Sequence, residues 1–477
     1  MKKSIMLPFL LLATSLWGEQ ERTTLLSDNI PAENKINSRI DYLISKAAAN
    51  IFQPRTEKIA QSKWLFYVMA AARNDLEPYF WRNLEQMKKI GSNENCTVVI
   101  RLDLYRKRGK RITKHLIVRK GYVEQIGPDL SLDSGDENAL ISELRWINNN
   151  FIFDKLAINF WNHGSGDVNP IMGKIFNPSY LFYFNPETQM LELDRSISFL
   201  DFIDKMAGAY AYADNQRGVC FDDSTGHFLD DKKLITAFNT FCMQDRKGKK
   251  IDVVFFDACL MAGVGTQSIL HKFANYMVAS EEAEMGWGYP YDLILAPFAK
   301  QDLSPADFAK HVVTAYDAFY KRITGDYTQS AIDLNKFSQL NENINNVSSS
   351  LIQALQLQQN NSVSKYIGQC YHATVQFEEP TYIDLGDFYN NLLKNINSIQ
   401  LQNKQQTQII VDALTKQLNY GLMLIAGTVI ENATGKNLLR AQGISIYLPQ
   451  NQIYPTYANT QFAQTNNWYQ FLKTYLA

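Results

Sequence analysis

The chain has few cysteines and no marked excess of charge. It contains five cysteines among 477 residues, whereas exported domains held by disulfides are richer in them, and an odd number leaves at least one thiol unpaired. Lys plus Arg number 47 and Asp plus Glu number 48, a net charge of −1. That balance gives no general attraction to nucleic acid or acidic membranes. We therefore expect no nucleic-acid partner, and any basic partner must be recognised locally.

Long apolar runs are also scarce. The N-terminus has basic residues at Lys2 and Lys3, an apolar run over 5–12 and small residues up to Gly18, an order that predicts a secretory signal peptide over residues 1–18. A weakly amphipathic helix is the alternative. The run is too short to span ~30 Å of bilayer, and no later stretch of about 18 apolar residues follows. We expect a secreted or periplasmic protein without stable membrane insertion; its oligomeric state is not predicted.

Strands and helices alternate after a mixed, polar lead-in segment over residues 19–61. Continuous apolar runs predict buried strands, and helical spacing predicts helices between them. The predicted strands are 64–69, 97–102, 156–161, 251–256 and 275–279, and the predicted helices are 76–90, 140–150 and 229–241. This alternation predicts an α/β core over 62–303 with a largely parallel sheet covered on both faces.

Two regions depart from this alternation. A long insert over 165–228 is rich in Gly, Asn, Asp and Tyr, too polar for a core, and long loops of this kind are usually functional. From residue 304 to 477 the helices lengthen and become rich in Asn and Gln, with strand-like runs at 382–385 and 443–449. No heptad pattern is sustained, so packed surface helices are favoured over a coiled coil. We expect this C-terminal region to pack on the core.

Two predicted strands end in turns that could carry chemistry. The third strand runs into Asn162-His163-Gly164, and the fourth runs into Asp257-Ala258-Cys259. In an open α/β sheet, ligands collect at the carboxyl ends of strands, so His163 and Cys259 could share one pocket. A thiol of pKa about 8.5 needs a neighbouring base near neutral pH. The amides of Gly164 and Cys259 could then stabilise an oxyanion.

Each half of this pair has a structural alternative, because a histidine at a strand end or a cysteine after a buried strand is commonly part of a core. Metal binding is a competing chemistry. Five polar side chains lie near the long insert: His163, Asp167, Asp222, Asp223 and His227. They lack the spacing of a zinc site. A hard cation at Asp222 and Asp223 is conceivable, although a solvated acidic turn before Gly226 is favoured.

The two turns belong to a longer series of short blocks. The blocks are Asn74-Asp75-Leu76, Met87 with Gly91, Asp222 with Leu229, Ser280-Glu281-Glu282, Tyr289-Pro290-Tyr291, 330–334 and 443–447. Together with the His-Gly and Asp-Ala-Cys turns, they resemble the clostripain-like peptidases of the caspase-type clan, in the expected order over Lys63 to Pro449. The stretches 160–163 and 285–288 vary from the family pattern.

The resemblance implies a caspase-like three-layer sandwich with a mostly parallel sheet and a helical C-terminal region. It implies a secreted cysteine endopeptidase with a His163–Cys259 dyad, no obligatory third member and an acyl-enzyme intermediate. It also implies protein or peptide substrates with a basic residue at P1. Asp257 would then bind the Arg or Lys side chain through charge-assisted hydrogen bonds, unless it only caps the following helix.

Ser280 and Glu281 would lie at the rim of the same cleft, where their role is to bind substrate or to cap a helix. No cofactor is required, and the family resemblance permits calcium stimulation. Four basic residues of the insert are candidate self-cleavage sites: Lys174, Arg195, Lys205 and Arg217. The rival interpretations are an inactive peptidase-like binding module and, less favoured, a metal-dependent hydrolase.

Overall fold

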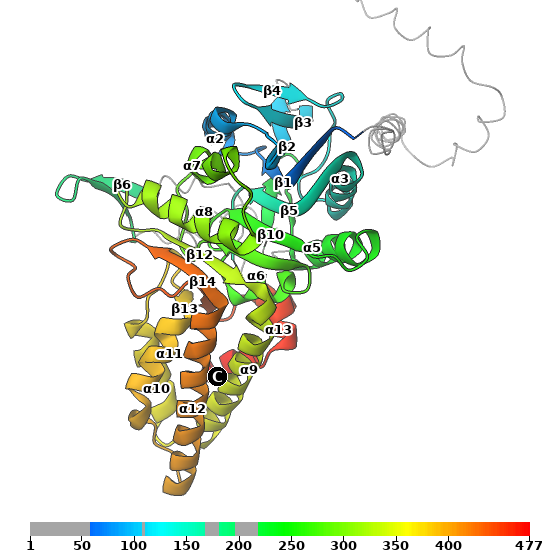
Figure 1. The fold of residues 1–477 in the computed structure, drawn as a ribbon. Helices are drawn as coiled ribbons and strands as arrows, with labels where there is room; N and C mark the ends of the chain where they lie inside the picture. The colour runs from blue at the N-terminus through cyan, green and yellow to red at the C-terminus, as the bar shows by residue number, and fades with distance from the viewer. Residues whose placement is uncertain (1–57, 107–109, 167–180, 196–217) are drawn as a thin grey trace, which may run out of the picture. The chain divides into compact units, whose positions relative to one another are not determined.

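A nine-stranded sheet forms the centre of the fold, in the order β14-β12-β11-β10-β5-β1-β2-β3-β4 (Figure 1). The structure is a computed structural model that describes residues 58–106, 110–166, 181–195 and 218–477. These residues all belong to one unit, residues 52–477. The predicted signal peptide, residues 1–18, and most of the predicted lead-in segment lie outside the described residues.

Five parallel strands make up the middle of the sheet. They are β1 (Ala60–Ala71), β2 (Cys96–Arg106), β5 (Phe151–Trp161), β10 (Ile251–Asp257) and β11 (Ala274–Ala279). The strand predictions are confirmed, and most of the strands extend beyond the apolar runs that indicated them. Residues 64–71 of β1 are all buried, as expected of a strand covered on both faces.

Antiparallel strands complete both edges of the sheet, and the sequence patterns did not indicate them. On one edge these are β3 (Lys110–Arg119) and β4 (Tyr122–Gln125), and on the other β12 (Thr328–Asp333) and β14 (Val429–Thr434). The last two strands come from the region after residue 304. That region therefore contributes part of the sheet as well as packing on it.

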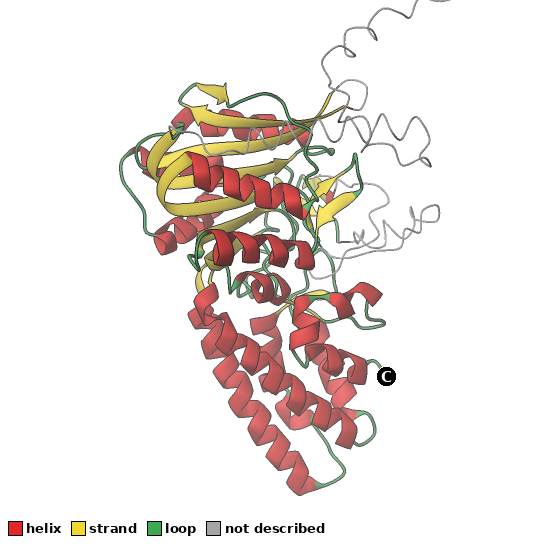
Figure 2. Ribbon diagram, turned by 90° about the vertical axis from the view of Figure 1, so that its right-hand side faces the viewer, coloured by secondary structure: helices red, strands yellow, loops and turns green. Residues whose placement is uncertain are grey.

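Helices cover both faces of the sheet and make a three-layer sandwich (Figure 2). One face carries α2 (Glu77–Ile90), α7 (Tyr291–Leu295) and α8 (Pro305–Tyr320), and the other carries α3 (Glu137–Asn150), α5 (Asp231–Phe238) and α6 (Val264–Leu270). Alternate β1 side chains enter two separate cores: Phe66 and Val68 on the α8 side, Leu65 and Tyr67 on the α3 side. This alternation is the two-residue period of a strand.

The predicted helix over 229–241 is divided in the structure. It starts as α5 and continues as a π-helical turn, η3 (Asn239–Asp245). Short 3₁₀ segments occur elsewhere as η4 (Ala296–Ala299), η5 (Leu334–Lys336), η6 (Ile396–Ser398) and η7 (Pro455–Asn459). The insert contributes two hairpins, β6 (Phe182–Asn185) with β7 (Met190–Leu193) and β8 (Val219–Asp222) with β9 (His227–Leu229). All of β8 is buried, so the prediction that the insert is too polar for the core is wrong for this strand.

The C-terminal region is mainly helical, as predicted. Its helices are α9 (Phe337–Leu357), α10 (Ser362–Ala373), α11 (Leu385–Lys394), α12 (Lys404–Thr428), α13 (Gln461–Thr465) and α14 (Trp468–Tyr475). The two strand-like runs predicted there form β13 (Tyr382–Asp384) and β15 (Ser445–Tyr447), which pair with each other in a separate small sheet.

Helix α12 is long and apolar enough to cross a membrane by length and composition alone, with a mean hydropathy of 1.2 over 18 residues. The sequence had indicated no such stretch after the N-terminus. In the structure, Ile410, Leu414, Leu418 and Ile425 of this helix are buried in the core. These four side chains pack inside the C-terminal region, whereas Ile409, Tyr420 and Met423 of the same helix are exposed.

Buried charges join the ends of β1 and β2 to the insert. The Arg73 guanidinium pairs with Asp222 and, at 3.2 Å, with Asp103, and all three side chains are fully buried. Asp222 also accepts a hydrogen bond from the Ser134 amide at 3.2 Å. Burial raises the pKa of this carboxyl, but Arg73 and the hydrogen bonds outweigh it and lower the pKa. Asp222 is therefore buried against Arg73, whereas Asp223, Ser224 and Gly226 of the turn that follows are exposed, so the predicted solvated turn holds for Asp223 and not for Asp222.

Arg73→Ala should lower the free energy of unfolding by about 3–5 kcal/mol, because it leaves two buried carboxylates without their counter-charge. The control is Arg119→Ala, which removes an exposed ion pair with Glu124 of 3.0 Å and should cost at most about 1 kcal/mol. Denaturant unfolding of both variants measures the difference. Equal losses would show that the buried pairs contribute no more than the exposed one.

Candidate active site

The predicted catalytic turns lie at the carboxyl ends of neighbouring parallel strands. Trp161 at the end of β5 pairs in register with Asp257 at the end of β10, and the Asn162 amide donates to the Asp257 carbonyl at 3.3 Å. His163 and Cys259 each follow two residues after this pair. The structure therefore brings the two turns together at one edge of the sheet.

Gly164 permits the close approach of these turns. A β-carbon at this position would lie 2.4 Å from the Cys259 carbonyl oxygen and 2.9 Å from Cγ of Met261, closer than real atoms come. Gly164 also forms a β-bridge with Val219, the first residue of β8. The role of its amide in an oxyanion hole stays a prediction.

The turn after Cys259 has an unusual backbone conformation. Leu260 has φ of 63°, a left-handed conformation that costs energy for a residue with a branched side chain. Two backbone hydrogen bonds hold it: Leu260 N–H donates to the Glu282 carbonyl at 3.3 Å and Ala262 N–H donates to the Ser280 carbonyl at 2.9 Å. The turn at 280–282 thus supports the turn that carries the cysteine.

His163 is oriented by a carboxylate that the sequence patterns had not singled out as a site residue. Its Nε2 lies 2.8 Å from Oδ1 of Asp75, where the histidine side chain is 5% exposed and the aspartate side chain 32% exposed. Asp75 follows β1, whose Ala70 pairs with Trp161. A polar residue just after a buried parallel strand adjoining β5 was the signal that could have identified it.

A second acidic group lies near this pair. The pKa of Asp223 is raised to about 7 by burial and by the charges of Asp75 and Asp222. His227, another predicted polar ligand, lies apart and contacts Asp133 at 2.7 Å, while Asp167 lies outside the described residues.

The Cys259 thiol is bound to backbone groups of Glu284. The Glu284 amide donates to Sγ at 3.2 Å, and the thiol donates to the Glu284 carbonyl at 3.6 Å. Burial raises the pKa of this thiol; the Glu284 amide opposes the shift, and the carboxylates of Glu284, Glu378 and Glu282 add to it. In this structure the thiol is therefore protonated, and its hydrogen bonds within the described residues are not to His163.

Asp257 belongs to a buried pair of carboxyl groups beneath Cys259. Its carboxylate accepts from the Tyr291 hydroxyl at 2.6 Å and from the Tyr289 amide at 3.2 Å. Burial raises the pKa of Asp257 to about 6, against hydrogen bonds from Tyr291, Tyr289 and Glu284. Burial and the nearby Asp257 raise the pKa of Glu284 well above its usual range. Burial therefore favours the protonated form of both groups.

This arrangement excludes one alternative for Asp257. The next helix, α6, begins with Gly263 as its N-cap residue, so Asp257 does not cap it. Glu284 was not among the predicted site residues, because nothing in its local pattern shows that it meets Asp257 across the turn. One carboxylate oxygen of Glu284 accepts from Gln329 at 3.1 Å, and the other is buried without a hydrogen bond.

Ser280 and Glu281 are fully buried and bind other parts of the protein. The Ser280 hydroxyl donates to the Glu282 carbonyl at 2.9 Å. Glu281 accepts from the Gly443 amide at 3.1 Å, and its pKa is raised by burial and by Asp384. Their contact with substrate stays a prediction, since their visible contacts stabilise the fold around the Cys259 turn.

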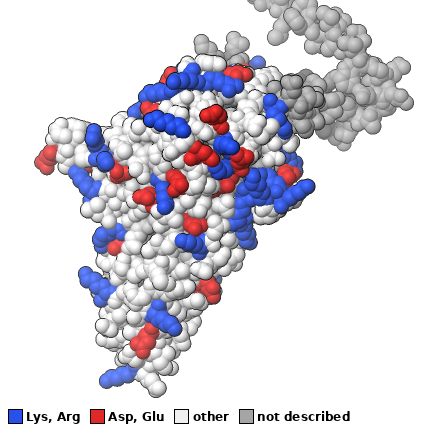
Figure 3. All heavy atoms as spheres, viewed as in Figure 1, with Lys and Arg blue, Asp and Glu red and all other residues white. Residues whose placement is uncertain are grey.

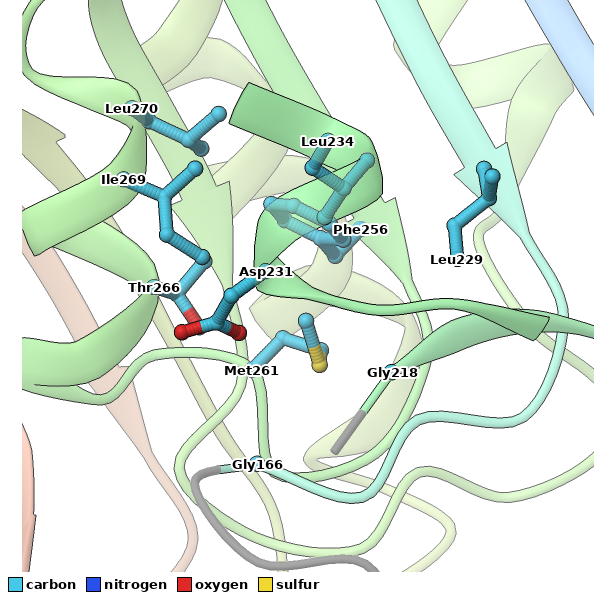
Figure 4. A pocket seen from close by; sticks show the side chains of 10 residues that line it. All are labelled: Gly166, Gly218, Leu229, Asp231, Leu234, Phe256, Met261, Thr266, Ile269 and Leu270. Atoms are coloured by element: carbon cyan, nitrogen blue, oxygen red, sulfur yellow. The ribbon is translucent and has the colours of Figure 1, made fainter. Parts of the chain in front are cut away.

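A small pocket lies on the α5 and α6 side of the sheet (Figure 4). Its lining is apolar apart from Asp231 and Thr266. Gly166 and Met261, which follow the histidine and cysteine turns, contribute to it, but His163 and Cys259 do not. In the part of the chain that the structure describes, no group of three His, Cys, Asp or Glu side chains could hold a metal ion.

Comparisons with known proteins agree with this geometry. The sequence model of the clostripain family matches residues 198–475. Two solved structures of secreted C11 cysteine proteases from Bacteroides thetaiotaomicron, one of them with an irreversible peptide inhibitor, each cover 86% of this chain and 99% of their own. Their TM-scores are both 0.52, at 16% and 12% identity. No curated protein matches.

The fold is that of the caspase-like C11 proteases. A turn that carries a cysteine lies beside a turn that carries a histidine. The chain belongs to the clostripain family of cysteine peptidases. The resemblance inferred from the sequence blocks is thereby confirmed.

Among the five cysteines, Cys259 should be alkylated first by iodoacetamide. It is 8% exposed and the other four are at most 1% exposed. Because the thiolate reacts and burial raises the pKa of Cys259, the rate in the intact chain should increase about tenfold per pH unit between pH 7 and 9. Peptide mass mapping, on protein whose intact mass has been verified, measures the order of alkylation and its dependence on pH. A rate independent of pH would show a preformed thiolate.

Proposed function

We propose that the protein is a secreted cysteine endopeptidase in which Cys259 attacks the scissile carbonyl after a basic residue and His163 transfers the protons. The observation that carries this proposal is the register of Trp161 with Asp257, which places a histidine turn and a cysteine turn side by side. A nucleophile and a base at one sheet edge is the minimum arrangement for acyl transfer through a covalent intermediate.

The chain's own residues supply each step. His163 takes the thiol proton as Cys259 leaves the Glu284 carbonyl, and later gives a proton to the departing amine. Asp75, which accepts a hydrogen bond from His163 Nε2 at 2.8 Å, orients the ring and stabilises its charged form. The amides of Gly164 and Cys259 are the proposed oxyanion donors. Water then hydrolyses the acyl-enzyme.

The buried carboxyl pair supports a preference for Arg or Lys at P1. Burial favours the protonated forms of Asp257 and Glu284, and a substrate's guanidinium or ammonium could replace a proton there. A guanidinium binds carboxylates through parallel charge-assisted hydrogen bonds, and it removes the cost of two acidic groups buried together. Gly288 contributes by leaving room, since a β-carbon there would lie 2.8 Å from Oδ1 of Asp257.

Secretion and self-processing complete the proposal. The predicted signal peptide and the description of the two structural relatives as secreted support export. The basic residues of the insert support cleavage in this segment; of the four candidates only Arg195 lies within the described residues. Calcium stimulation stays a prediction. Acidic and basic side chains lie side by side on the face seen in Figure 3, which agrees with the net charge of −1.

Cys259→Ala and His163→Ala should each abolish hydrolysis of arginyl peptides, because nucleophile and base act as one unit. Asp75→Asn should retain part of the activity and change its dependence on pH, since the ring keeps a hydrogen-bonding partner but loses a counter-charge. Fluorogenic peptide assays and intact-mass spectra measure activity and any cut between His163 and Cys259. An active Cys259→Ala protein would reject the mechanism, and an inactive wild type would favour the binding-module alternative.

Asp257→Asn should reduce kcat/KM for cleavage after Arg at least about tenfold, because a buried guanidinium loses a counter-charge. Its effect on stability has a defined direction. Burial raises the pKa of Asp257 to about 6, so the wild type loses stability as pH rises through 6, and the variant lacks this loss. Peptide kinetics and unfolding between pH 4 and 8 measure both. Unchanged cleavage after Arg would remove Asp257 from the specificity site.

A further inference from the structure

Arg195 of the insert is bound to two buried carboxylates close to Cys259. Its Nη2 lies 3.0 Å from Oε2 of Glu282 and 3.2 Å from Oδ1 of Asp326. The Glu282 and Asp326 side chains are 0% and 3% exposed, whereas that of Arg195 is 40% exposed. The acidic partners are thus fixed in the interior while the cation reaches them from the surface.

A docked hairpin places Arg195 there. The Leu191 amide, in β7, donates to the Ile323 carbonyl at 2.8 Å, and the Leu193 amide donates to Oδ2 of Asp326 at 3.1 Å. Leu181 and Leu193 are buried beneath the hairpin. Backbone and apolar contacts therefore hold this part of the insert against the loop before β12, so the position of Arg195 does not depend on its ion pairs alone.

Glu282 connects this ion pair to the catalytic turn. Its carbonyl accepts from the Leu260 amide, next to the nucleophile, and its charge acts on the Cys259 thiol. Its carboxylate also accepts from the amides of Ala283 at 2.8 Å and Glu378 at 2.7 Å. The Glu282 carboxylate thus accepts from two backbone amides and from one charged donor, the guanidinium of Arg195. These surroundings suit an arginine side chain.

The two acidic pairs near Cys259 are neutralised in different ways. Burial favours the protonated forms of Asp257 and Glu284, whereas Glu282 and Asp326 share Arg195. Burying a carboxylate without a proton or a cation is costly, so the second pair needs a cation while it is charged. When Arg195 leaves, another guanidinium or ammonium can take its place.

We propose that Glu282 and Asp326 form a binding site for a substrate guanidinium beside Cys259, and that Arg195 occupies this site in the intact chain and competes with substrate. The proposal rests on the proposed peptidase function and extends it by adding a second cation site, apart from the Asp257 and Glu284 pair, together with its internal competitor. The partial exposure of Arg195 is what allows exchange: a substrate side chain can displace it without unfolding the core.

The test measures binding in the absence of cleavage. In a Cys259→Ala background, calorimetric titration with N-acetyl-arginine amide should show about tenfold tighter binding when Arg195→Gln is added, because the site is no longer occupied. N-acetyl-norleucine amide, which lacks the charge, should bind equally weakly to both. The matched control is Arg440→Gln, which removes a similarly exposed arginine that pairs with Asp387 at 3.4 Å and should leave probe affinity unchanged.

Two further variants separate competition from a purely structural role. Adding Asp326→Asn to the Arg195→Gln protein should weaken probe binding again, whereas a structural role would change only the unfolding temperature. If Arg195→Gln does not fold, Arg195→Lys keeps the charge but cannot bridge both carboxylates equally, and it should bind the probe with intermediate affinity. Probe affinity equal to that of the parent in the folded variant would overturn the proposal. Because these proteins lack the nucleophile, failure of peptide hydrolysis in the wild type would not alter the outcome.

Discussion

Backbone pairing between parallel strands is the constraint on which the site depends. Hydrogen bonds between β5 and β10 fix Trp161 opposite Asp257, and those between β1 and β5 fix Ala70 opposite Trp161. Parallel strands end at the same edge, so the residues that follow each strand are brought together without any direct attraction between them. This register brings together the turns that carry His163, Cys259 and Asp75. Gly164 allows the histidine and cysteine turns to approach closely.

Four carboxyl groups lie buried around the cysteine turn, where burial disfavours their charged forms. Asp257, Glu281, Glu282 and Glu284 are all at most 5% exposed. Burial raises the pKa of Asp257, of Glu284 and of Glu281, which also interacts with Asp384, and Glu282 pairs with Arg195. Such a cluster costs folding energy, which is the pattern expected where a cation must be recognised in competition with water.

The sequence predicted the parts of this structure that depend on local pattern. Continuous apolar runs indicated β1, β5 and β10, and the polar turns after them indicated His163 and Cys259. It did not predict β3, which forms a hairpin with β2, or β12 and β14, which are short and pair with each other across a long stretch of chain. Nor did it identify Glu284 or the contacts of Asp75 and Arg195, because these join segments tens to hundreds of residues apart. Such contacts follow from the register and from loop paths, and no local periodicity encodes either of them.

The state of the thiol connects these features. Burial, and to a smaller extent the charges of three carboxylates, raises the pKa of Cys259, so the proposed nucleophile forms a thiolate more readily when the nearby negative charge is compensated. In the intact chain Arg195 compensates one of these carboxylates, Glu282. On the proposal above, a substrate that displaces Arg195 must supply its own cation, or Glu282 is left unpaired and the thiolate is disfavoured further. A basic side chain satisfies both conditions and an apolar one satisfies neither. Selectivity for basic residues would then arise in the activation of the nucleophile as well as in binding.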